Sequence, residues 1–292
     1  MFQIISDSGC DFTKEESQKY NVDIVPFYVS FDQSTHLKEG VDISKEEFFN
    51  KLVEETKLFP KTSQPSPQDY IDILTPHLDA GKDILILTIS SKLSGSYSSA
   101  TLAAEILAQE YSQTRTITII DSLNGSIGQG LILREIIKMR DAGLSLSEVV
   151  TYADKILKST RVYVTLDSLE YAKRGGRIGT TTAFVGNILK LRPILHVKEG
   201  RVLELDNVRG KKKALRLMEE SLLNVLSDVK NNVSLAIGHI LSEEDSAGFK
   251  SCLESSLNIK IDNPITHIGA TIGAHAGPGA LAIAYCKKYK FV

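Results

Sequence analysis

The sequence predicts an α/β protein of two domains: an N-terminal domain on a parallel sheet, and a C-terminal α+β domain whose sheet is mainly antiparallel. The chain has 292 residues, which is long for one domain of about 150 residues. Between residues 84 and 141, apolar strand-like runs alternate with helical segments, the order of parallel crossover units. Apolar runs on both sides of Glu199-Gly200 indicate an antiparallel hairpin. We expect domains of residues 1–159 and 160–292 with a cleft between them.

Apolar patterning and capping residues predict the elements of the N-terminal half. Ser44 and Glu47 form a capping-box pattern that starts one helix, and Ser66 is placed to cap the next. In chain order we expect strand 2–6, helix 14–20, strand-like run 22–31, helix 45–55, a proline-stiffened loop 61–67, a helix to 81, strand 84–89, a Ser/Gly turn 90–99, helix 100–111, strand 116–120, and helices 130–141 and 146–158.

The C-terminal half is predicted to contain a hairpin, two long helices and a glycine-rich closing segment. The expected elements are strand 162–166, hairpin strands 193–197 and 202–205, helix 211–229, strand 234–240 and helix 243–257. The stretch 263–286 has no Lys, Arg, Asp or Glu and passes the length test for a spanning helix. Its four glycines and two prolines argue against one, so we expect strand, glycine loop and helix in that order.

The composition is that of a globular protein without a nucleic-acid partner. Hydrophobic residues make up 42% and charged residues 24% of the chain, and the formal net charge is −2. Non-specific binding of DNA or RNA needs a positive surface field that this balance does not supply. Three cysteines without a CxxC pair, and an N-terminus that begins as a strand, predict a cytoplasmic protein without a targeting peptide.

Patterns for metal ions, ATP and dinucleotides are absent from the sequence. It contains no HExxH, no paired zinc ligands and no GxxxxGK[ST] loop. Gly125, Gly128 and Gly130 do not have the spacing of a dinucleotide fingerprint. We therefore expect no metal, no cofactor and no ATP bound by this chain.

Two segments have the residues to hold an anion. Ser94, Gly95 and Ser96 lie where a buried strand passes into a helix, so hydroxyls and free helix N–H groups converge there. The alternative is that these serines only cap the helix. Thr62 and Ser63 add two hydroxyls on the proline-stiffened loop, although such a composition is also ordinary for a loop.

A histidine and two basic runs complete the candidate residues. His275 is surrounded by small residues, including Gly273, which let the backbone approach a ligand closely and leave the imidazole as the main functional group. The segment around Arg174 and Arg177, and the run that starts at Arg209, could each hold a phosphate or an acidic partner surface. The alternative for the segment around Arg174 and Arg177 is a solvated turn.

Five segments together resemble the DegV family of bacterial lipid-binding proteins. They are DSGCD at 7–11, TSQPSP at 62–67, SSKLSGSYSSA at 90–100, LEYAKRGGRI at 169–178 and GAHAGPGALA at 273–282. Each motif alone is weak, whereas the set in this order is specific and covers nearly the whole chain. The resemblance implies that one long-chain fatty acid, for example hexadecanoate, lies between the two domains.

The resemblance also implies the residues that hold the ligand. Thr62 and Ser94 match the hydroxyl residues that hold the carboxylate, and His275 matches a histidine near the head group. The residues expected to support this site are Ser63, Gly95, Ser96 and Gly273. Apolar segments 184–191 and 265–272 are candidates to line the tunnel for the tail.

The activity implied by the resemblance is that of a carrier and not of an enzyme. A separate ATP-dependent fatty acid kinase would phosphorylate the bound carboxylate, and the acyl phosphate would pass to phospholipid synthesis through an acyltransferase or a transient contact with a membrane surface. Contacts with the partner or the phosphate are expected from Arg174, Arg177 and Arg209.

Two other classes of function stay open at the level of sequence. A serine hydrolase, or esterase, would use Ser94 as nucleophile and His275 as base, although the chain lacks G-x-S-x-G and no acid can be singled out as the third member. A small-molecule sensor or interaction protein would use the basic run 209–216 to bind a regulatory partner.

Overall fold

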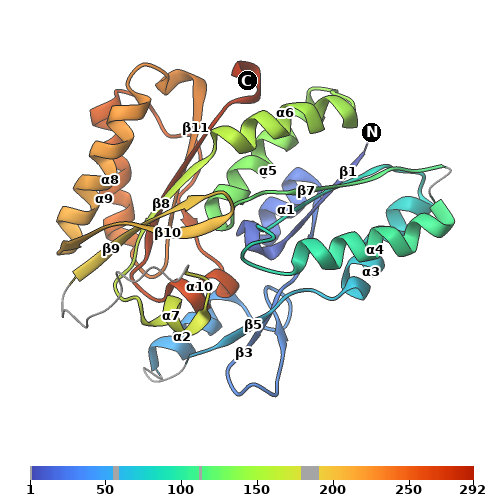
Figure 1. Cartoon of the computed structure of the whole chain (residues 1–292), viewed down its shortest axis with the longest axis horizontal. Coiled ribbons are helices and arrows are strands. Elements are labelled where there is room, and N and C mark those ends of the chain that lie inside the picture. Colours follow the sequence, from blue (N-terminus) through green and yellow to red (C-terminus); the bar gives the residue numbers. More distant parts are fainter. Residues whose placement is uncertain (1, 55–58, 112–113, 179–190) are drawn as a thin grey trace.

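The computed structural model describes residues 2–54, 59–111, 114–178 and 191–292, and its strands form two main sheets (Figure 1). The first sheet has the order β2-β1-β6-β7. Its strands are β1 (Gln3–Asp7), β2 (Val22–Val25), β6 (Ile84–Thr88) and β7 (Ile117–Asp121). Every neighbouring pair in it runs parallel, which confirms the crossover units predicted for this half.

Helices cover both faces of the parallel sheet, as its continuous apolar strands require. On one face, α3 (Pro67–Asp79) and α4 (Ser96–Tyr111) share a core with β6 through residues such as Tyr70 and Ala100. On the other face, α5 (Ser126–Asp141) contributes Leu131 to a core that includes Leu87. A short helix, α1 (Lys14–Tyr20), joins β1 to β2.

Hydrogen bonds confirm two predicted helix starts. At α2 (Lys45–Glu54), the Glu47 backbone N–H donates to Ser44 Oγ at 3.1 Å, and the Ser44 N–H donates to the Glu47 carboxylate at 2.8 Å. At α3, Ser66 and Asp69 form the same reciprocal pair. Both helices therefore begin where their capping residues predict.

The second sheet is mixed and has the order β10-β9-β8-β13-β11-β12. Its strands are β8 (Arg161–Thr165), β9 (Leu191–Lys198), β10 (Arg201–Arg209), β11 (Val233–His239), β12 (Thr266–His267) and β13 (Leu281–Lys287). The β9–β10 hairpin turns at Glu199 and Gly200 as predicted, and only the β11–β12 pair is parallel among the described strands of this sheet. The mainly antiparallel C-terminal sheet is thus confirmed.

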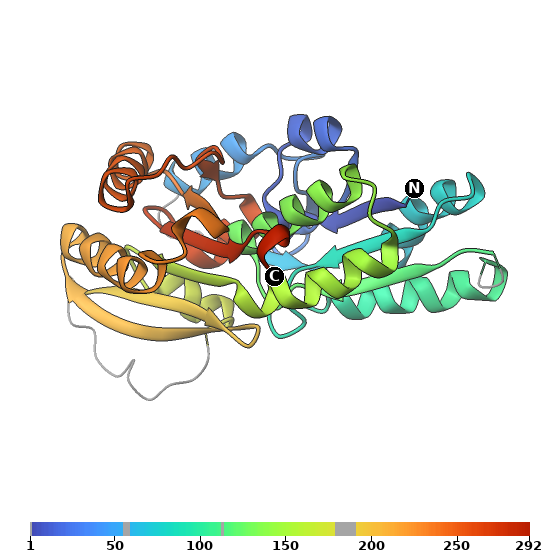
Figure 2. The same ribbon diagram turned by 90° about the horizontal axis from the view of Figure 1, so that it is seen from above.

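Two pairs of helices enclose the second sheet. α8 (Lys211–Leu226) and α9 (Glu243–Leu257) pack on one face through a core that includes Met218 and Phe249. α5 and α6 (Leu146–Ser159) pack on the other face, where Ala282 and Ala284 of β13 belong to the same core as Ile132. Figure 2 shows α8 and α9 at the opposite end of the molecule from α4.

The predicted strand-like run 22–31 is not continuous, because it forms two strands in different sheets. β2 ends at Val25, and β3 (Tyr28–Ser30) joins a small sheet of order β4-β3-β5. Pro26 lies between them and has no N–H for a ladder hydrogen bond, so the chain leaves the parallel sheet there. The partners of β3 are β4 (Leu37–Lys38) and β5 (Lys61–Ser63), and the second pairing places Thr62 opposite Val29.

The predicted order of the closing segment is wrong. The structure has a short strand, β12, then helix α10 (Ala270–Ala276), then a glycine turn and the long strand β13. Gly277 and Gly279, with φ of +74° and +81°, end the helix and turn the chain, which a residue with a side chain could not do without strain. The apolar run after them is the buried strand between β8 and β11, and not a helix.

Helix α5 connects the two halves of the protein. Its small residues bring it close to both: an added Cβ at Gly130 would lie 2.6 Å from the Cys10 carbonyl, and one at Gly128 would lie 2.5 Å from a methyl of Val162 on β8. One continuous core contains residues from β6, α5 and β13. The boundary between residues 159 and 160 stays a prediction, because this core spans both sides of it.

The remaining described elements are short. They are α7 (Glu170–Gly175) and the 3-10 helices η1 (Ser8–Cys10), η3 (Lys230–Asn232) and η4 (Tyr289–Phe291). Within the described residues, no helix combines the length and apolar character needed to cross a membrane.

Two glycine substitutions test the packing of α5. Gly130→Ala should destabilise the protein by about 1–3 kcal/mol, because the new methyl meets a backbone carbonyl that cannot move away. Gly248→Ala on the exposed face of α9 meets nothing within 4 Å and should stabilise by about 0.5–1 kcal/mol through helix propensity. Urea unfolding of both variants measures the difference, and equal effects would contradict the close approach of α5 to η1.

Candidate functional site

A cavity of about 410 Å³ lies between the two main sheets. One side is formed by the loops that follow β6 and β7, with Ile89, Leu93 and Ser126. The opposite side is formed by strands of the second sheet, including Val164 of β8 and Leu195 of β9. Its size is that of a pocket for a small organic ligand, and most of its wall is apolar.

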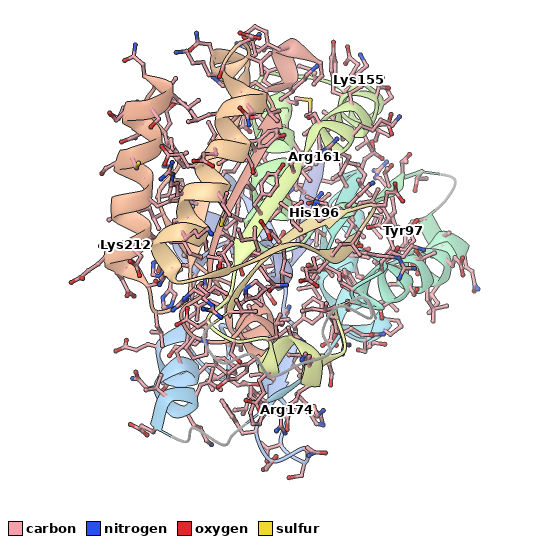
Figure 3. The ribbon with its side chains drawn as sticks, turned by 60° about the vertical axis from the view of Figure 1, so that its left-hand side comes forward. Tyr97, Lys155, Arg161, Arg174, His196 and Lys212 are labelled. Atoms are coloured by element: carbon pink, nitrogen blue, oxygen red, sulfur yellow. The ribbon has the colours of Figure 1, made fainter. Side chains whose placement is uncertain are left out.

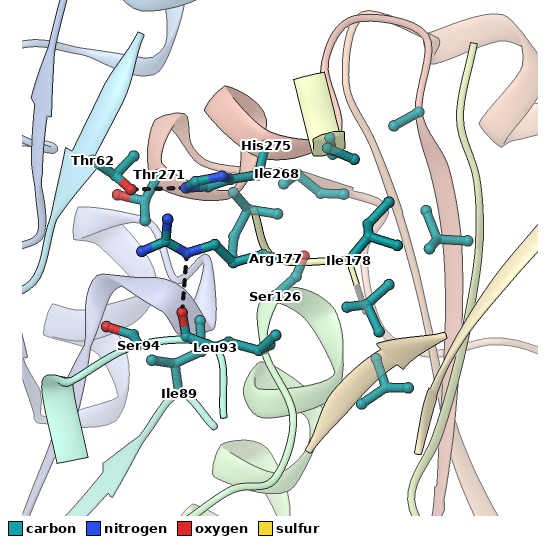
Figure 4. Close-up of a pocket in the computed structure, with 18 of the residues that line it drawn as sticks. Thr62, Ile89, Leu93, Ser94, Ser126, Arg177, Ile178, Ile268, Thr271 and His275 are labelled. Atoms are coloured by element: carbon teal, nitrogen blue, oxygen red, sulfur yellow. Dashed lines mark hydrogen bonds between the residues drawn. The ribbon is translucent and has the colours of Figure 1, made fainter. Parts of the chain in front are cut away.

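The polar groups of this cavity gather at one end (Figure 4). Thr62 comes from β5, Ser94 from the loop before α4, Arg177 from the segment after α7, and His275 from α10. Thr62 Oγ1 and His275 Nε2 are 2.8 Å apart and share a hydrogen bond. The structure therefore brings together the three residues that the sequence predicted for a carboxylate, and adds one arginine.

The surroundings of His275 determine which ring nitrogen carries the proton. Nδ1 is buried and has no hydrogen-bond partner among the described residues. Gly175 packs directly against it, so closely that an added Cβ would collide with Nδ1. A proton on Nδ1 would point at this backbone, so we assign the proton of the neutral ring to Nε2, which then donates to Thr62 Oγ1. The hydroxyl proton of Thr62 is then free to donate into the cavity.

The imidazole of His275 is neutral at pH 7. Burial, with smaller contributions from the positive charges of Arg177 and Lys61, lowers the pKa of His275 to about 4. The polar end of the cavity thus has two neutral hydrogen-bond donors, His275 and Thr62, and a positive charge on another side chain.

Arg177 supplies that charge. Its Nε donates to the Leu93 carbonyl at 3.3 Å and its Nη1 donates to the Gly175 carbonyl at 2.6 Å. These bonds hold the guanidinium across the polar end, between the loop of Ser94 and the helix of His275 (Figure 4). An anion at this end would face the guanidinium of Arg177 and several hydroxyl groups.

The predicted supporting residues differ in where they lie. Ser63 lines the cavity, and the backbone N–H of Gly95 donates to the side chain of Gln64 at 3.2 Å. Ser96 is fully buried, and its hydroxyl donates to Asp7 at 2.7 Å, so it does not line the cavity. Gly273 instead allows α10 to approach α2, where an added Cβ would lie 2.5 Å from the ring of Phe49.

Asp7 explains why Ser96 is turned away. Its carboxylate also accepts from the side chain of Gln129 at 2.8 Å and from the backbone N–H of Ile89 at 2.9 Å. Burial raises the pKa of Asp7 to about 6. The first residue of the DSGCD segment thus links the turn after β6, the start of α4 and helix α5.

Two polar lining residues, Gln64 and Ser126, were not among the predicted site residues, and a third, Thr271, was predicted only as part of the tunnel segment 265–272. Ser126 could have been found, because it starts the helix after β7, at the same sheet edge as the Ser94 turn. Ile268 and Ile272, from the predicted tunnel segment 265–272, also line the cavity; residues 184–190 lie outside the described part.

Of the three predicted partner arginines, only Arg177 lies at the cavity. Arg174 is exposed on α7, where it pairs with Glu170 at 2.9 Å and lies over the ring of Phe59. Arg209 is exposed at the end of β10, two residues before α8 begins at Lys211. Figure 3 shows Arg174 and Lys212 on separate parts of the surface.

The geometry does not form a hydrolytic triad in the part of the chain that is described. His275 Nε2 bonds to Thr62 and not to Ser94, whose Oγ instead accepts from the backbone N–H of Ser96 at 3.2 Å. No described acid reaches Nδ1 of His275. A nucleophile needs a hydrogen-bonded base with a third group to orient it.

Comparisons with known proteins agree with this fold. The model of the DegV family, described as an uncharacterised protein family, matches residues 1–288. A DegV domain-containing protein of Clostridium acetobutylicum is 33% identical over 283 residues, which cover 97% of this chain and 96% of the relative.

Two solved structures are similar over almost their whole length. A stearic-acid-binding protein of Eubacterium ventriosum has a TM-score of 0.93 and 32% identity, and the match covers 100% of both chains. A DegV family protein of Thermus thermophilus, described for its fatty acid binding, has a TM-score of 0.88 and 28% identity over 98% of this chain and 99% of its own. The protein described here belongs to the DegV family.

Proposed function

We propose that this protein binds one long-chain fatty acid in the cavity, with the carboxylate at Thr62, Ser94 and His275. The observation that carries the proposal is a mostly apolar cavity with its hydroxyls, imidazole and one arginine at a single end. Such an arrangement suits a ligand that has one anionic head and a long apolar tail. Fatty acids bound to the related proteins support this ligand class.

The tail supplies most of the affinity in this proposal. Removal of a sixteen-carbon tail from water is worth about 12 kcal/mol at about 0.8 kcal/mol per methylene, before the costs of ordering. The strands of the second sheet offer apolar side chains such as Val162, Val197 and Val202 along the cavity. Because hydrophobic contacts are non-directional, the tail is held without a polar group that would fix its length.

The head group is held by hydrogen bonds and one charge. A carboxylate removed from water must be hydrogen-bonded or paired. Thr62 can donate because His275 Nε2–H already occupies its oxygen, and Ser94 can donate from the opposite loop. Arg177 balances the negative charge without forming a covalent bond, so the carboxylate keeps its reactivity.

The finer role that we propose is that of a non-catalytic carrier in the cytoplasm. A separate ATP-dependent fatty acid kinase would phosphorylate the bound carboxylate, and the acyl phosphate would pass to phospholipid synthesis through an acyltransferase or the membrane surface. We propose Arg177 as the contact for the phosphate, since it lies at the head-group end, and Arg174 and Arg209 as contacts for the partner, since both are exposed and do not line the cavity. The support for the kinase is the resemblance of the motifs, and no bound cofactor is required of this chain.

Substitutions of Thr62 test the head-group site. Thr62→Val removes the hydroxyl with little change in shape and should weaken hexadecanoate binding about tenfold to a hundredfold, the cost of losing a hydrogen bond to a charged group. Thr62→Ser keeps the hydroxyl and is the matched control. Isothermal titration of delipidated protein gives both dissociation constants; equal constants for the two variants would remove Thr62 from the site.

Arg177→Gln tests the charge at the polar end. Loss of the positive charge should raise the pKa of His275 above about 4, while burial keeps it below 6.5. Since the folded protein resists protonation of this ring, stability falls as the pH drops from about 6.5 to about 4, and the variant should lose less stability over that range. NMR titration of the His275 ring measures the pKa. Arg174→Gln is the control, and an equal shift there would contradict the placement of Arg177.

An ester assay separates the carrier from the hydrolase. We expect no turnover of a chromogenic acyl ester above the buffer rate, because His275 bonds to Thr62 and not to Ser94. Turnover that disappears in Ser94→Ala would establish catalysis and reject the carrier.

A further inference from the structure

A buried carboxylate outside the cavity holds two of its walls together. Glu39 follows β4 and is 7% exposed. Its carboxylate accepts from the hydroxyl of Ser8 at 2.7 Å, from the hydroxyl of Thr271 at 2.7 Å and from the backbone N–H of Thr271 at 3.2 Å. Ser8 belongs to η1 and Thr271 to α10, so this one side chain links the two ends of the chain.

The hydrogen-bond partners of Glu39 either line the cavity or bond to a residue that does. Thr271 itself lines the cavity. On the other side, Ser8 Oγ accepts from the backbone N–H of Phe27 at 3.0 Å, and the Phe27 carbonyl accepts from the Glu39 N–H at 2.9 Å. Phe27 also lines the cavity. Glu39 therefore sets the separation of the wall at Phe27 from the wall at α10.

A second carboxylate limits movement of the same helix. The N–H of Gly269, just before α10, donates to Asp11 Oδ1 at 2.9 Å, and the hydroxyl of Ser126 donates to Asp11 Oδ2 at 2.5 Å. An added Cβ at Gly269 would collide with Glu39, so the backbone approaches both carboxylates closely. The start of α10 is thus fixed by acceptors from two different elements.

The orientation of α10 determines where His275 lies. His275 is four residues after Thr271 and therefore on the same face of the helix, one turn further on. A rotation of α10 would separate His275 Nε2 from Thr62 Oγ1, which are 2.8 Å apart. It would also free the Thr271 hydroxyl, now committed to Glu39, to face the cavity.

We propose that Glu39 is a positioning residue for the head-group site: by accepting from Thr271 and Ser8 it fixes α10, and so holds His275 against Thr62. The inference rests on the proposed fatty-acid site and adds a residue that does not touch the ligand. Glu39 lies outside the five sequence motifs from which the site was predicted.

The test is Glu39→Gln, with Glu135→Gln as a matched control. Glu135 on α5 is also buried, at 0% exposed, and accepts from Ser234 Oγ at 2.7 Å and from the Tyr289 N–H at 3.0 Å. It lies about 14 Å along α5 from Ser126. Both substitutions exchange a bonded carboxylate oxygen for an amide nitrogen that donates, so both should lower stability.

Only Glu39→Gln should affect the site. We expect about tenfold weaker binding of hexadecanoate, the effect of disturbing one charge-assisted hydrogen bond, and a shift of the ¹⁵N and ¹³C signals of the His275 ring. Glu135→Gln should leave both unchanged. If the first variant does not fold, Ser8→Ala removes one donor to Glu39 and should shift the same signals in the same direction.

Two results distinguish the failure of each proposal. Unchanged hexadecanoate affinity and unchanged His275 signals in folded Glu39→Gln would overturn the positioning role while leaving the fatty-acid site intact. If the wild-type protein binds no hexadecanoate, the proposed function fails, and the His275 signals alone then decide whether Glu39 positions this ring.

Discussion

Hydrogen bonds to buried carboxylates hold the two halves of this protein in place. Asp7 accepts from Ile89 in the turn after β6, from Ser96 at the start of α4 and from Gln129 of α5, and Asp11 and Glu39 bond to the start of α10. Burial raises the pKa of Asp7 and of Asp11 to about 6. Each of these carboxyl groups can be buried because several hydrogen-bond donors point at it. These bonds hold the two segments that carry Ser94 and His275: the turn between β6 and α4, and the helix α10.

The cavity follows from that arrangement. The connections after β6 and β7 lie on one side of the cavity, and strands such as β8 and β9 of the second sheet lie on the other. Apolar strands such as β8 and β9 line most of it, and the turns bring the polar groups to one end. The cavity therefore has a long apolar region and a compact region of hydrogen-bond donors. A molecule with an anionic head and an apolar tail fits both.

The sequence predicted those parts of the structure that depend on neighbours in the chain. Capping boxes located α2 and α3, and apolar runs located the parallel strands. Pro26 and the turn at Gly277 are local signals too. Their effect on the fold, however, depends on which sheet the next strand joins, and the strands of that sheet are distant in sequence. The contacts of Gly175 with His275, and of Glu39 with Thr271, join segments about 100 and 232 residues apart. Such pairs have no local signature, so the proton assignment on His275 and the role proposed for Glu39 could be argued only from the three-dimensional structure.

Native mass spectrometry of the protein purified from cells, followed by organic extraction and identification of the bound molecule, tests the central proposal most directly. The proposal predicts one long-chain fatty acid per chain, displaced stoichiometrically by added hexadecanoate. A protein that carries no lipid and takes up none when fatty acid is added would contradict it, and the cavity would then need a ligand of another kind.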